Sequence, residues 1–348
     1  MFFASDNAGP AHPKALEALV AANAGYAMGY GADTEMDEVR AMLRDIFEAP
    51  EAMVHLAATG TAANVLLLGT MTAPWETVFC TKMSHINCDE CNAPEFYTGA
   101  KLTLVGDENA KMTPEALEAA ILAEGNRGVH GPQRGPVSIT QVSERGTVYS
   151  LDEIRALTNI AHAHGLQVHM DGARFANALV ALGCSAAEMT WKAGIDAVSF
   201  GGTKNGLMGA EACIMFDPAK TQEFELRRKR GAHLFSKHRY LSAQMKAYLL
   251  DDLWLDLAGR ANGSAARLEA GLAPRNDVHL PFGRDANMIF FEAPRGLHQK
   301  LQGGGAVYYV EDGDVAVGDP GAVLTGRLVC DWSMTEGGVD QFLALMQG

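Results

Sequence analysis

The sequence is short of positive charge. Its 28 lysines and arginines face 42 aspartates and glutamates, which gives a formal net charge of −14. Nucleic acids and anionic membranes bind positive surfaces, so we expect neither as a partner, although residues 227–230 form one local basic run. Long apolar runs are also missing, because nothing approaches the roughly 20 apolar residues of a membrane span. The apolar stretch 15–24 is interrupted by Glu17 and Asn23 and predicts a surface helix.

Cysteine is sparse and a secretion signal is missing. Six cysteines are scattered over 348 residues, which favours a reduced, cytoplasmic protein. The start, residues 1–7, has no basic segment leading into an apolar one. Cys88 and Cys91 have the spacing of a zinc or redox pair, but no second pair completes the roughly four ligands of a zinc site. We therefore favour a structural role for both cysteines and expect no metal.

The middle of the chain alternates helix-like and strand-like segments. Ser150 with Glu153, and Ser185 with Glu188, have the spacing of capping boxes and predict two helix starts. Short apolar runs predict strands at 77–80, 102–105, 137–142, 166–170, 196–200 and 213–216. Short apolar strands between capped helices are typical of a mostly parallel sheet covered on both faces.

The C-terminal part has a different pattern. Helical segments at 243–257 and 261–272 precede shorter strand-like runs at 288–292, 307–310 and 328–331. We expect a large domain with an N-terminal arm over residues 1–245 and a smaller α+β domain over residues 246–348, joined by a long helix.

Two charged residues stand where predicted strands end. Asp171 follows the run 166–170, and Lys204 lies in a glycine-rich turn, residues 201–206, after the run 196–200. In parallel sheets, ligands bind beyond the carboxyl ends of the strands. A lysine that forms a Schiff base and an aspartate that keeps a pyridine nitrogen protonated are what a pyridoxal 5′-phosphate (PLP) enzyme needs. The sequence therefore predicts PLP bound covalently to Lys204, with its ring nitrogen on Asp171.

Other residues fit the same site, each with a simpler alternative. Gly60 and Thr61 begin a predicted helix and would offer free N–H groups to a phosphate, or form an ordinary capped turn. Arg174 would reach the cofactor's phenolic oxygen, hold Asp171, or lie on the surface. His85 would stack on the ring and relay a proton, or be a polar loop residue. His169 shares the strand face of Asp171 and would support it.

Taken together, these residues resemble the low-specificity L-threonine aldolases and phenylserine aldolase, which are PLP enzymes of fold type I. The most specific matches are the segments 169–175 and 202–206, and further matches lie at 4–7, 30–33, 59–61 and 85–96. The resemblance implies an α/β, aspartate aminotransferase-like fold and a homo-oligomer, either dimer or tetramer. It implies aldol cleavage of L-β-hydroxy-α-amino acids, such as L-threonine, L-allo-threonine or phenylserine, to glycine and an aldehyde. An aminotransferase, a β-eliminating lyase and a non-catalytic role are the alternatives.

The resemblance also implies residue roles. The catalytic residues would be Lys204, His85 and Asp171, and we add Glu144 because of its position at the one departure from the family. The cofactor would be bound by Thr59, Gly60, Thr61, His85, Asp171, Arg174, Thr203, Lys204 and, from a neighbouring subunit, Arg239. The amino-acid substrate would be bound by Ser5, Tyr30, Arg174 and Arg327. In one place the sequence departs from the family: Glu144 or Ser143 stands where many members have a histidine that contacts the substrate hydroxyl, so the residue that handles this proton is open.

Overall fold

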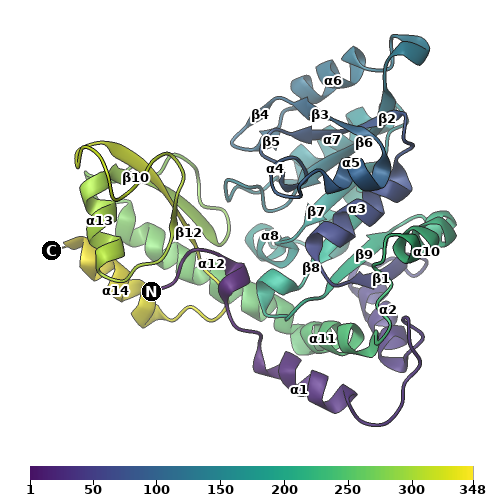
Figure 1. The fold of residues 1–348 in the computed structure, drawn as a ribbon, viewed down its shortest axis with the longest axis horizontal. Coiled ribbons are helices and arrows are strands. Elements are labelled where there is room, and N and C mark those ends of the chain that lie inside the picture. The colour runs from purple at the N-terminus through teal and green to yellow at the C-terminus, as the bar shows by residue number, and fades with distance from the viewer. Residues whose placement is uncertain (348) are drawn as a thin grey trace.

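The computed structural model describes residues 1–347, and a seven-stranded sheet forms its centre (Figure 1). In spatial order the strands are β1 (Met53–Ala57), β9 (Glu211–Met215), β8 (Ala197–Gly201), β7 (Val168–Gly172), β6 (Gln133–Thr140), β2 (Glu76–Thr81) and β3 (Lys101–Val105). The five strands β8, β7, β6, β2 and β3 are parallel to one another, whereas β9 is antiparallel to both β8 and β1. The mostly parallel sheet predicted from the sequence is confirmed. Strand β1 was not predicted, because His55 interrupts its short apolar run.

Helices cover both faces of this sheet. The helices of this part are α1 (Pro13–Ala22), α2 (Thr34–Ile46), α3 (Gly60–Met71), α4 (His85–Cys88), α5 (Ala93–Thr98), α6 (Pro114–Ala123), α7 (Leu151–Ala163), α8 (Phe175–Leu182), α9 (Ala186–Met189), α10 (Thr221–Arg230) and α11 (Arg239–Leu249). Both predicted capping boxes are present, at the starts of α7 and α9. A short hairpin, β4 (Asp107–Glu108) with β5 (Lys111–Met112), lies outside the main sheet.

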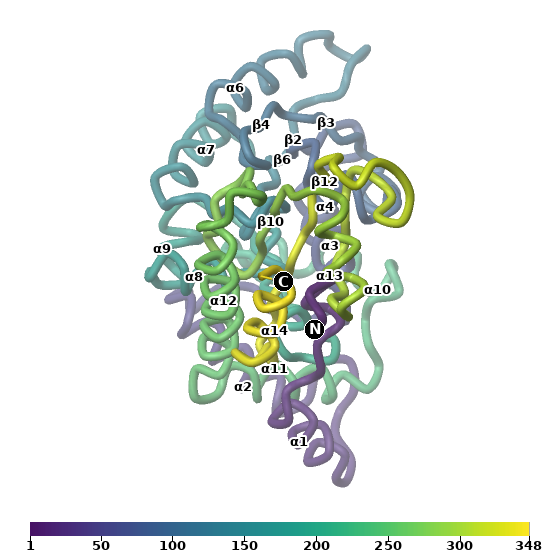
Figure 2. Tube along the Cα trace, turned by 90° about the vertical axis from the view of Figure 1, so that its left-hand side faces the viewer, coloured from purple at the N-terminus to yellow at the C-terminus, as the bar shows by residue number. Residues whose placement is uncertain are grey.

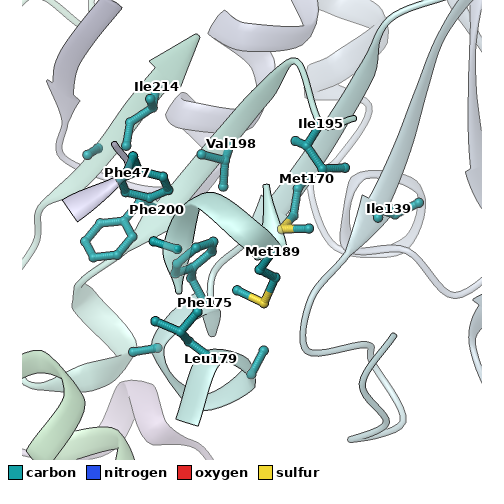
Figure 3. Close-up of a cluster of buried hydrophobic side chains, with 14 of the residues drawn as sticks. Phe47, Ile139, Met170, Phe175, Leu179, Met189, Ile195, Val198, Phe200 and Ile214 are labelled. Carbon is teal, nitrogen blue, oxygen red and sulfur yellow. The ribbon is translucent and has the colours of Figure 1, made fainter. Parts of the chain in front are cut away.

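Alternate residues of the strands face two separate apolar layers. One face packs against α3, where Met53, Ala197 and Met215 belong to the same buried cluster as the helix. The other face carries the main core, in which Phe47, Phe175 and Phe200 pack together, with ring centroids 5.4–5.9 Å apart (Figure 3). Aromatic pairs at these distances add to the free energy of burial. This packing holds the carboxyl ends of β7 and β8 in fixed positions.

The C-terminal part forms a second, three-stranded antiparallel sheet (Figure 1). Its elements are β10 (Met288–Pro294), β11 (Tyr309–Val310), β12 (Val323–Val329), α12 (Leu253–Leu272), α13 (Arg295–Gly303) and α14 (Glu336–Gln347). The predicted helix break near residue 259 is wrong, because α12 continues through it. The chain breaks instead at Asp251 and Asp252, which adopt positive φ values of 54° and 52°. The last strand also begins earlier than the predicted run 328–331.

Buried residues of α12 belong to two different clusters. Leu253, Trp254 and Leu257 pack in the main core, whereas Leu268 and Leu272 pack in the core of the smaller sheet. A division of the chain at residue 245 therefore stays a prediction. No helix within residues 1–347 combines the length and apolar character needed to cross a membrane.

The N-terminal arm packs on the smaller sheet rather than on the larger one. Phe2 forms a β-bridge with Val307, and the Phe3 amide donates to the Val307 carbonyl at 2.7 Å. Phe3 is completely buried against Phe342. Figure 2 shows the start of the chain beside α13 and α14, before it turns towards α1. The arm therefore connects the two parts of the molecule beside the ends of β7 and β8.

Candidate active site

A cavity of about 380 Å³ lies at the carboxyl ends of β7 and β8. It brings together most of the residues predicted from the sequence: Thr59, Gly60, Thr61, His85, Glu144, Asp171, Arg174, Thr203 and Lys204. It is also lined by residues that the sequence analysis did not select: Asn7, Asn64 and Glu211.

The N-terminus of α3 presents free amides to this cavity. Thr59 caps the helix, and its hydroxyl accepts from the Ala62 amide at 3.2 Å. Among the hydrogen bonds of residues 1–347, none uses the N–H of Gly60 or Thr61. Gly60 and Thr61 both line the cavity, and a Cβ added at Gly60 would meet no atom within 4 Å. Free amides and the positive end of the dipole of a 12-residue helix favour an anion here.

Lys204 lies on the short 3-10 turn Thr203–Asn205, directly after β8. Burial lowers the pKa of its ammonium group, and the Arg174 guanidinium lowers it further. The turn needs glycine at both ends, because Gly206 has a φ of +100° and a Cβ at Gly202 would lie 2.6 Å from the Ala210 carbonyl. A buried lysine with a lowered pKa is more readily the neutral amine, which is the nucleophilic form.

A buried network joins Asp171 to His85. The Asn64 amide donates to Asp171 Oδ2 and to Glu90 Oε1, both at 2.9 Å. The same Glu90 oxygen lies 2.8 Å from His85 Nδ1. The hydrogen bond to Glu90 raises the pKa of His85. Asn64, on α3, and Glu90, in the turn between α4 and α5, therefore place the two predicted ring contacts relative to each other.

His169 supports this network only indirectly. Its ring bonds to the Ser138 and Ser199 hydroxyls, at 2.9 and 3.1 Å, and burial lowers its pKa to about 4. Ser199 in turn donates to Asn64 Oδ1 at 2.7 Å. His169 is therefore a neutral residue that does not contact Asp171 through its side chain.

His85, Glu90 and Asp171 also lie within the spacing of a metal site, since their ligand atoms are within 4.8 Å of one another. The Asn64 N–H groups, however, point at both carboxylates. An amide donor and a cation compete for the same carboxylate oxygens, so the arrangement is that of a hydrogen-bond network. Cys88 and Cys91 are both exposed and free, and their role stays open.

Glu144 is a buried acid beside His85. Its Oε1 accepts from the His85 amide and from the Thr140 hydroxyl, both at 2.9 Å. Its Oε2 is buried and has no partner in the described part of the chain. Burial raises its pKa to about 7. Ser143, the alternative at this position, bonds instead to the Thr147 hydroxyl at 2.6 Å and does not line the cavity.

Arg174 pairs with a residue that the sequence analysis did not anticipate. Its Nε and Nη2 donate to the two carboxylate oxygens of Asp6, at 2.7 and 2.9 Å. The alternative in which Arg174 holds Asp171 is therefore wrong, as is the surface alternative, because the pair is largely buried. Asp6 lies on the N-terminal arm, which explains the error: a partner so distant in the sequence leaves no local pattern. The same guanidinium still lines the cavity.

The smaller sheet brings Arg327 to the edge of the site. Its Nη2 donates to the Ala4 carbonyl at 3.3 Å, and its guanidinium lies 5.3 Å from the Tyr309 ring centre. Its buried Nε has no partner among residues 1–347, and burial together with Arg174 lowers its pKa. Ser5 follows Ala4 and caps a short 3-10 helix by accepting from the Asn7 amide. Both residues thus lie beside the Arg174–Asp6 pair.

Four predicted site residues do not line this cavity: Ser5 and Arg327, which lie beside the Arg174–Asp6 pair, and Tyr30 and Arg239. Tyr30 is 54% exposed, with the Lys229 ammonium 5.3 Å from its ring centre. Arg239 begins α11 and donates to the Gly25 carbonyl at 3.0 Å. Within one chain, neither side chain contributes to the cavity. The roles proposed for them require a second subunit.

The donor set of the cavity fits PLP. Free amides at the start of α3 suit a phosphate, Lys204 is a buried amine, and Asp171 is a carboxylate fixed by Asn64 and by the Ala173 amide at 3.0 Å. The unpartnered Oε2 of Glu144 is left for a polar group within the cavity. Anion cradle, amine and carboxylate thus share one cavity.

The sheet order and this cavity define an α/β enzyme of PLP fold type I, as predicted from the sequence. The solved structure of *Leishmania major* threonine aldolase is similar to this chain with a TM-score of 0.92 and 26% identity, covering 99% of this chain and 98% of that one. Serine palmitoyltransferase from *Sphingomonas wittichii* shares the fold, with a TM-score of 0.71 at 14% identity, and the match covers 100% of this chain and 86% of that one.

Sequence comparison gives the family. Residues 3–294 match the beta-eliminating lyase family, and the chain belongs to that family. It is 37% identical to a low specificity L-threonine aldolase of *Pseudomonas* sp., over 98% of this chain and 96% of the relative. It is 38% identical to a protein of the same name from *Pseudomonas aeruginosa*, over 95% and 92% of the two chains. The resemblance to low-specificity L-threonine aldolases is confirmed.

Proposed function

We propose that this chain catalyses PLP-dependent aldol cleavage of L-β-hydroxy-α-amino acids to glycine and an aldehyde. The observation that carries the proposal is the single cavity that holds Lys204, Asp171 and the free N-terminus of α3. Relatives of nearly equal length named as L-threonine aldolases support the reaction class.

The cofactor would be held by residues already in place. Gly60 and Thr61 would donate N–H groups to the phosphate, and Lys204 would carry the covalent link. Asp171 would hold the ring nitrogen, with His85 against the ring face. When bound, PLP supplies an electron sink for the bond that breaks at the substrate Cα. Asn64 keeps the Asp171 carboxylate in position for this task, because it donates to Oδ2 at 2.9 Å.

Glu144 is the group that we assign to the proton of the β-hydroxyl. Its free Oε2 lines the cavity beside His85, and its pKa of about 7 lets it accept and return a proton near neutral pH. Glu144 thus takes the place of the histidine that many family members have here.

Arg327 and Ser5 would bind the substrate carboxylate. The unpartnered Nε of Arg327 is a buried donor at the edge of the cavity, and Arg174 adds positive charge next to it. A carboxylate fixed there sets the rotation about the Cα–N bond, which decides which bond at Cα stands perpendicular to the cofactor ring. Cleavage of the Cα–Cβ bond requires that bond to be the perpendicular one.

We also propose a homo-oligomer, in which Tyr30 and Arg239 would act at a neighbouring subunit's site, and a cytoplasmic location. The oligomer is supported by the exposure of Tyr30, which does not line the cavity of its own chain. The location is supported by the scarcity of cysteine.

The test is aldehyde release by the purified protein with PLP. L-threonine and L-allo-threonine should give acetaldehyde, and phenylserine should give benzaldehyde, each with glycine in equal amount. The D-enantiomers should react poorly. Transfer of the amino group to a keto acid without aldehyde release would establish an aminotransferase instead, and ammonia release would establish a β-eliminating lyase. Borohydride reduction should attach the cofactor to Lys204, and label on Lys82 or Lys192 would contradict the assignment.

A further inference from the structure

Glu211 is a buried acid in the cavity that the proposed reaction does not use. It begins β9 and faces the turn that carries Lys204. Its Oε2 accepts from the Gly202 amide at 2.8 Å, and its Oε1 accepts from the Thr203 hydroxyl. Glu211 as a whole is only 5% exposed. Both contacts are to residues directly before Lys204.

Thr203 cannot serve Glu211 and a phosphate at once while Glu211 is ionised. A threonine hydroxyl has one proton to donate, and here that proton points at Glu211. A phosphate dianion offers only acceptors, as does a carboxylate. With Glu211 ionised, the cavity would therefore place a second anion near the phosphate and withhold the Thr203 donor from it.

A proton on Glu211 resolves this conflict. The carboxyl O–H then donates to Thr203 Oγ, and the Thr203 proton becomes free to donate to the phosphate. The Gly202 amide can still donate to the other carboxyl oxygen. No residue has to move, because only the direction of one hydrogen bond reverses.

We propose that Glu211 is a positioning residue that takes up one proton from solvent when the phosphate of the cofactor binds, so that Thr203 donates to that phosphate. The proposal rests on the cofactor site assigned above. Titratable groups around Glu211 come from four elements: Lys204 on the turn, Asp171 on β7, Cys213 on β9 and Tyr248 on α11. Lys204 favours the ionised acid and Asp171 opposes it, while burial is the largest effect and raises the pKa of Glu211 to about 7.

The consequence is a cofactor affinity that depends on pH through one proton. The acid is protonated below about pH 7, so the phosphate binds without penalty there. Above that value, the affinity for the phosphate should fall by about tenfold per pH unit, as for any binding step coupled to the uptake of one proton. The second ionisation of the phosphate itself, near pH 6, is already complete in this range.

The experiment measures the dissociation constants of PLP and of pyridoxal, which lacks the phosphate, for the cofactor-free protein across this pH range. The dissociation constant of pyridoxal divided by that of PLP measures how much the phosphate contributes to the affinity. In the wild type, this ratio should decline above about pH 7. In Glu211→Gln it should stay high at every pH, because the amide N–H donates permanently to Thr203 and the amide oxygen still accepts from Gly202.

Two further variants complete the design. Thr203→Val should give a lower ratio that varies less with pH than in the wild type, because only the repulsion between ionised Glu211 and the phosphate remains. Adding Glu211→Gln to Thr203→Val should remove this remaining pH dependence without restoring the wild-type ratio. Pyridoxal binding reports whether each variant is folded. Parallel pH curves for the wild type and Glu211→Gln would overturn the proposal, as would a weakened phosphate contribution in Glu211→Gln. Aldehyde release at saturating PLP, measured on the same samples, tests the proposed reaction separately.

Discussion

The acid–base chemistry of the site depends on partners rather than on single residues. His85 owes its raised pKa first to Glu90, and Glu144 owes its raised pKa to burial. The cavity thus holds two titratable groups with raised pKa values, and Glu144 is joined to the backbone of His85 because its carboxylate accepts from the His85 amide at 2.9 Å. Each group can be tested by removing a charge without removing volume.

Glu90→Gln should lower the pKa of His85. The glutamine can still contact Nδ1, but it no longer offers a charged acceptor to the imidazolium form. The titration of the His85 ring, followed by NMR of the cofactor-free protein, should shift to lower pH. Asp89→Asn is the matched control, because it removes the neighbouring exposed carboxylate and should leave this titration unchanged. An unshifted His85 in Glu90→Gln would contradict the assigned cause.

Glu144→Gln should remove the acidic limb of the pH–rate profile. In the wild type, the rate of aldehyde release should fall as the pH drops below about 7, because the protonated acid cannot accept the hydroxyl proton. The variant should lose about 10²–10⁴-fold in kcat, the usual contribution of a general base. Thr140→Val provides a second check: it removes a hydrogen bond that stabilises the carboxylate, so the limb should move to higher pH. A retained limb in Glu144→Gln would assign the proton to another group.

The sequence predicted those site residues that carry a local signature. Lys204 and Asp171 follow apolar strands, and Gly60 begins a helix, so their positions can be read from neighbouring residues. Asp6, Glu90 and Glu211 carry no such signature. Their roles come from contacts across the fold, such as Asp6 with Arg174, which no spacing along the chain reveals.

At the scale of elements, the N-terminal arm links the smaller sheet to the site. Phe3 fixes the arm in the core around β10 and β12. Ala4, Ser5 and Asp6 then reach Arg327 and Arg174. The arm therefore transmits the position of the smaller sheet to the residues proposed to bind the substrate carboxylate.

Phe3→Ala should raise KM more than it lowers the affinity for PLP. Removal of a fully buried phenylalanine costs about 3–5 kcal/mol of stability in a core that cannot collapse, and here the loss falls on the arm. Phe2→Ala is the matched control, since Phe2 is 49% exposed on the same arm. Steady-state kinetics with L-threonine and PLP titration separate the two effects. Equal kinetic effects of the two variants would mean that the arm does not position the substrate.

The elements themselves were predicted unevenly. Capping boxes and apolar runs gave α7, α9 and most strands of the main sheet. Strand β1 was missed because of His55, which is buried and stacks on Phe224 with ring centroids 5.2 Å apart. The helix break before α12 was predicted at the wrong position. Asp251 and Asp252 adopt a left-handed conformation there, and no glycine in the sequence indicates it.

At the scale of the whole molecule, an apolar surface around α3, α5 and α10 is left exposed. Phe96 is 82% exposed and Leu226 is 65% exposed, and both line a broad cavity of about 920 Å³. Exposed apolar residues gathered in one place mark an interaction surface. This surface is the part of the chain best suited to the homo-oligomer that we propose.

Leu226→Lys should therefore weaken self-association. Light scattering of the wild type should give a dimer or tetramer. On dilution, the variant should dissociate at a protein concentration at which the wild type is still associated. Val129→Lys is the control, because Val129 is 96% exposed but lies outside this cavity. If Tyr30 and Arg239 complete a neighbouring site, the dissociated variant should also lose activity. A monomeric, fully active wild type would contradict both statements.

Strand β9 carries a consequence for how the chain folds. It lies between β8 and β1, so Met53 of β1 pairs with Met215 of β9. The other strands of the large sheet lie between these two residues in the sequence. During synthesis, β1 has no strand partner until residue 215 has left the ribosome, whereas α3, the helix that follows it, can already pack on β8. Contacts so distant along the chain form slowly, because a long loop must close before they gain anything. The turn from β1 into α3, where we propose that the phosphate binds, should consequently be among the last parts of the site to assemble. Refolding should then regain cofactor binding later than it regains the parallel strands.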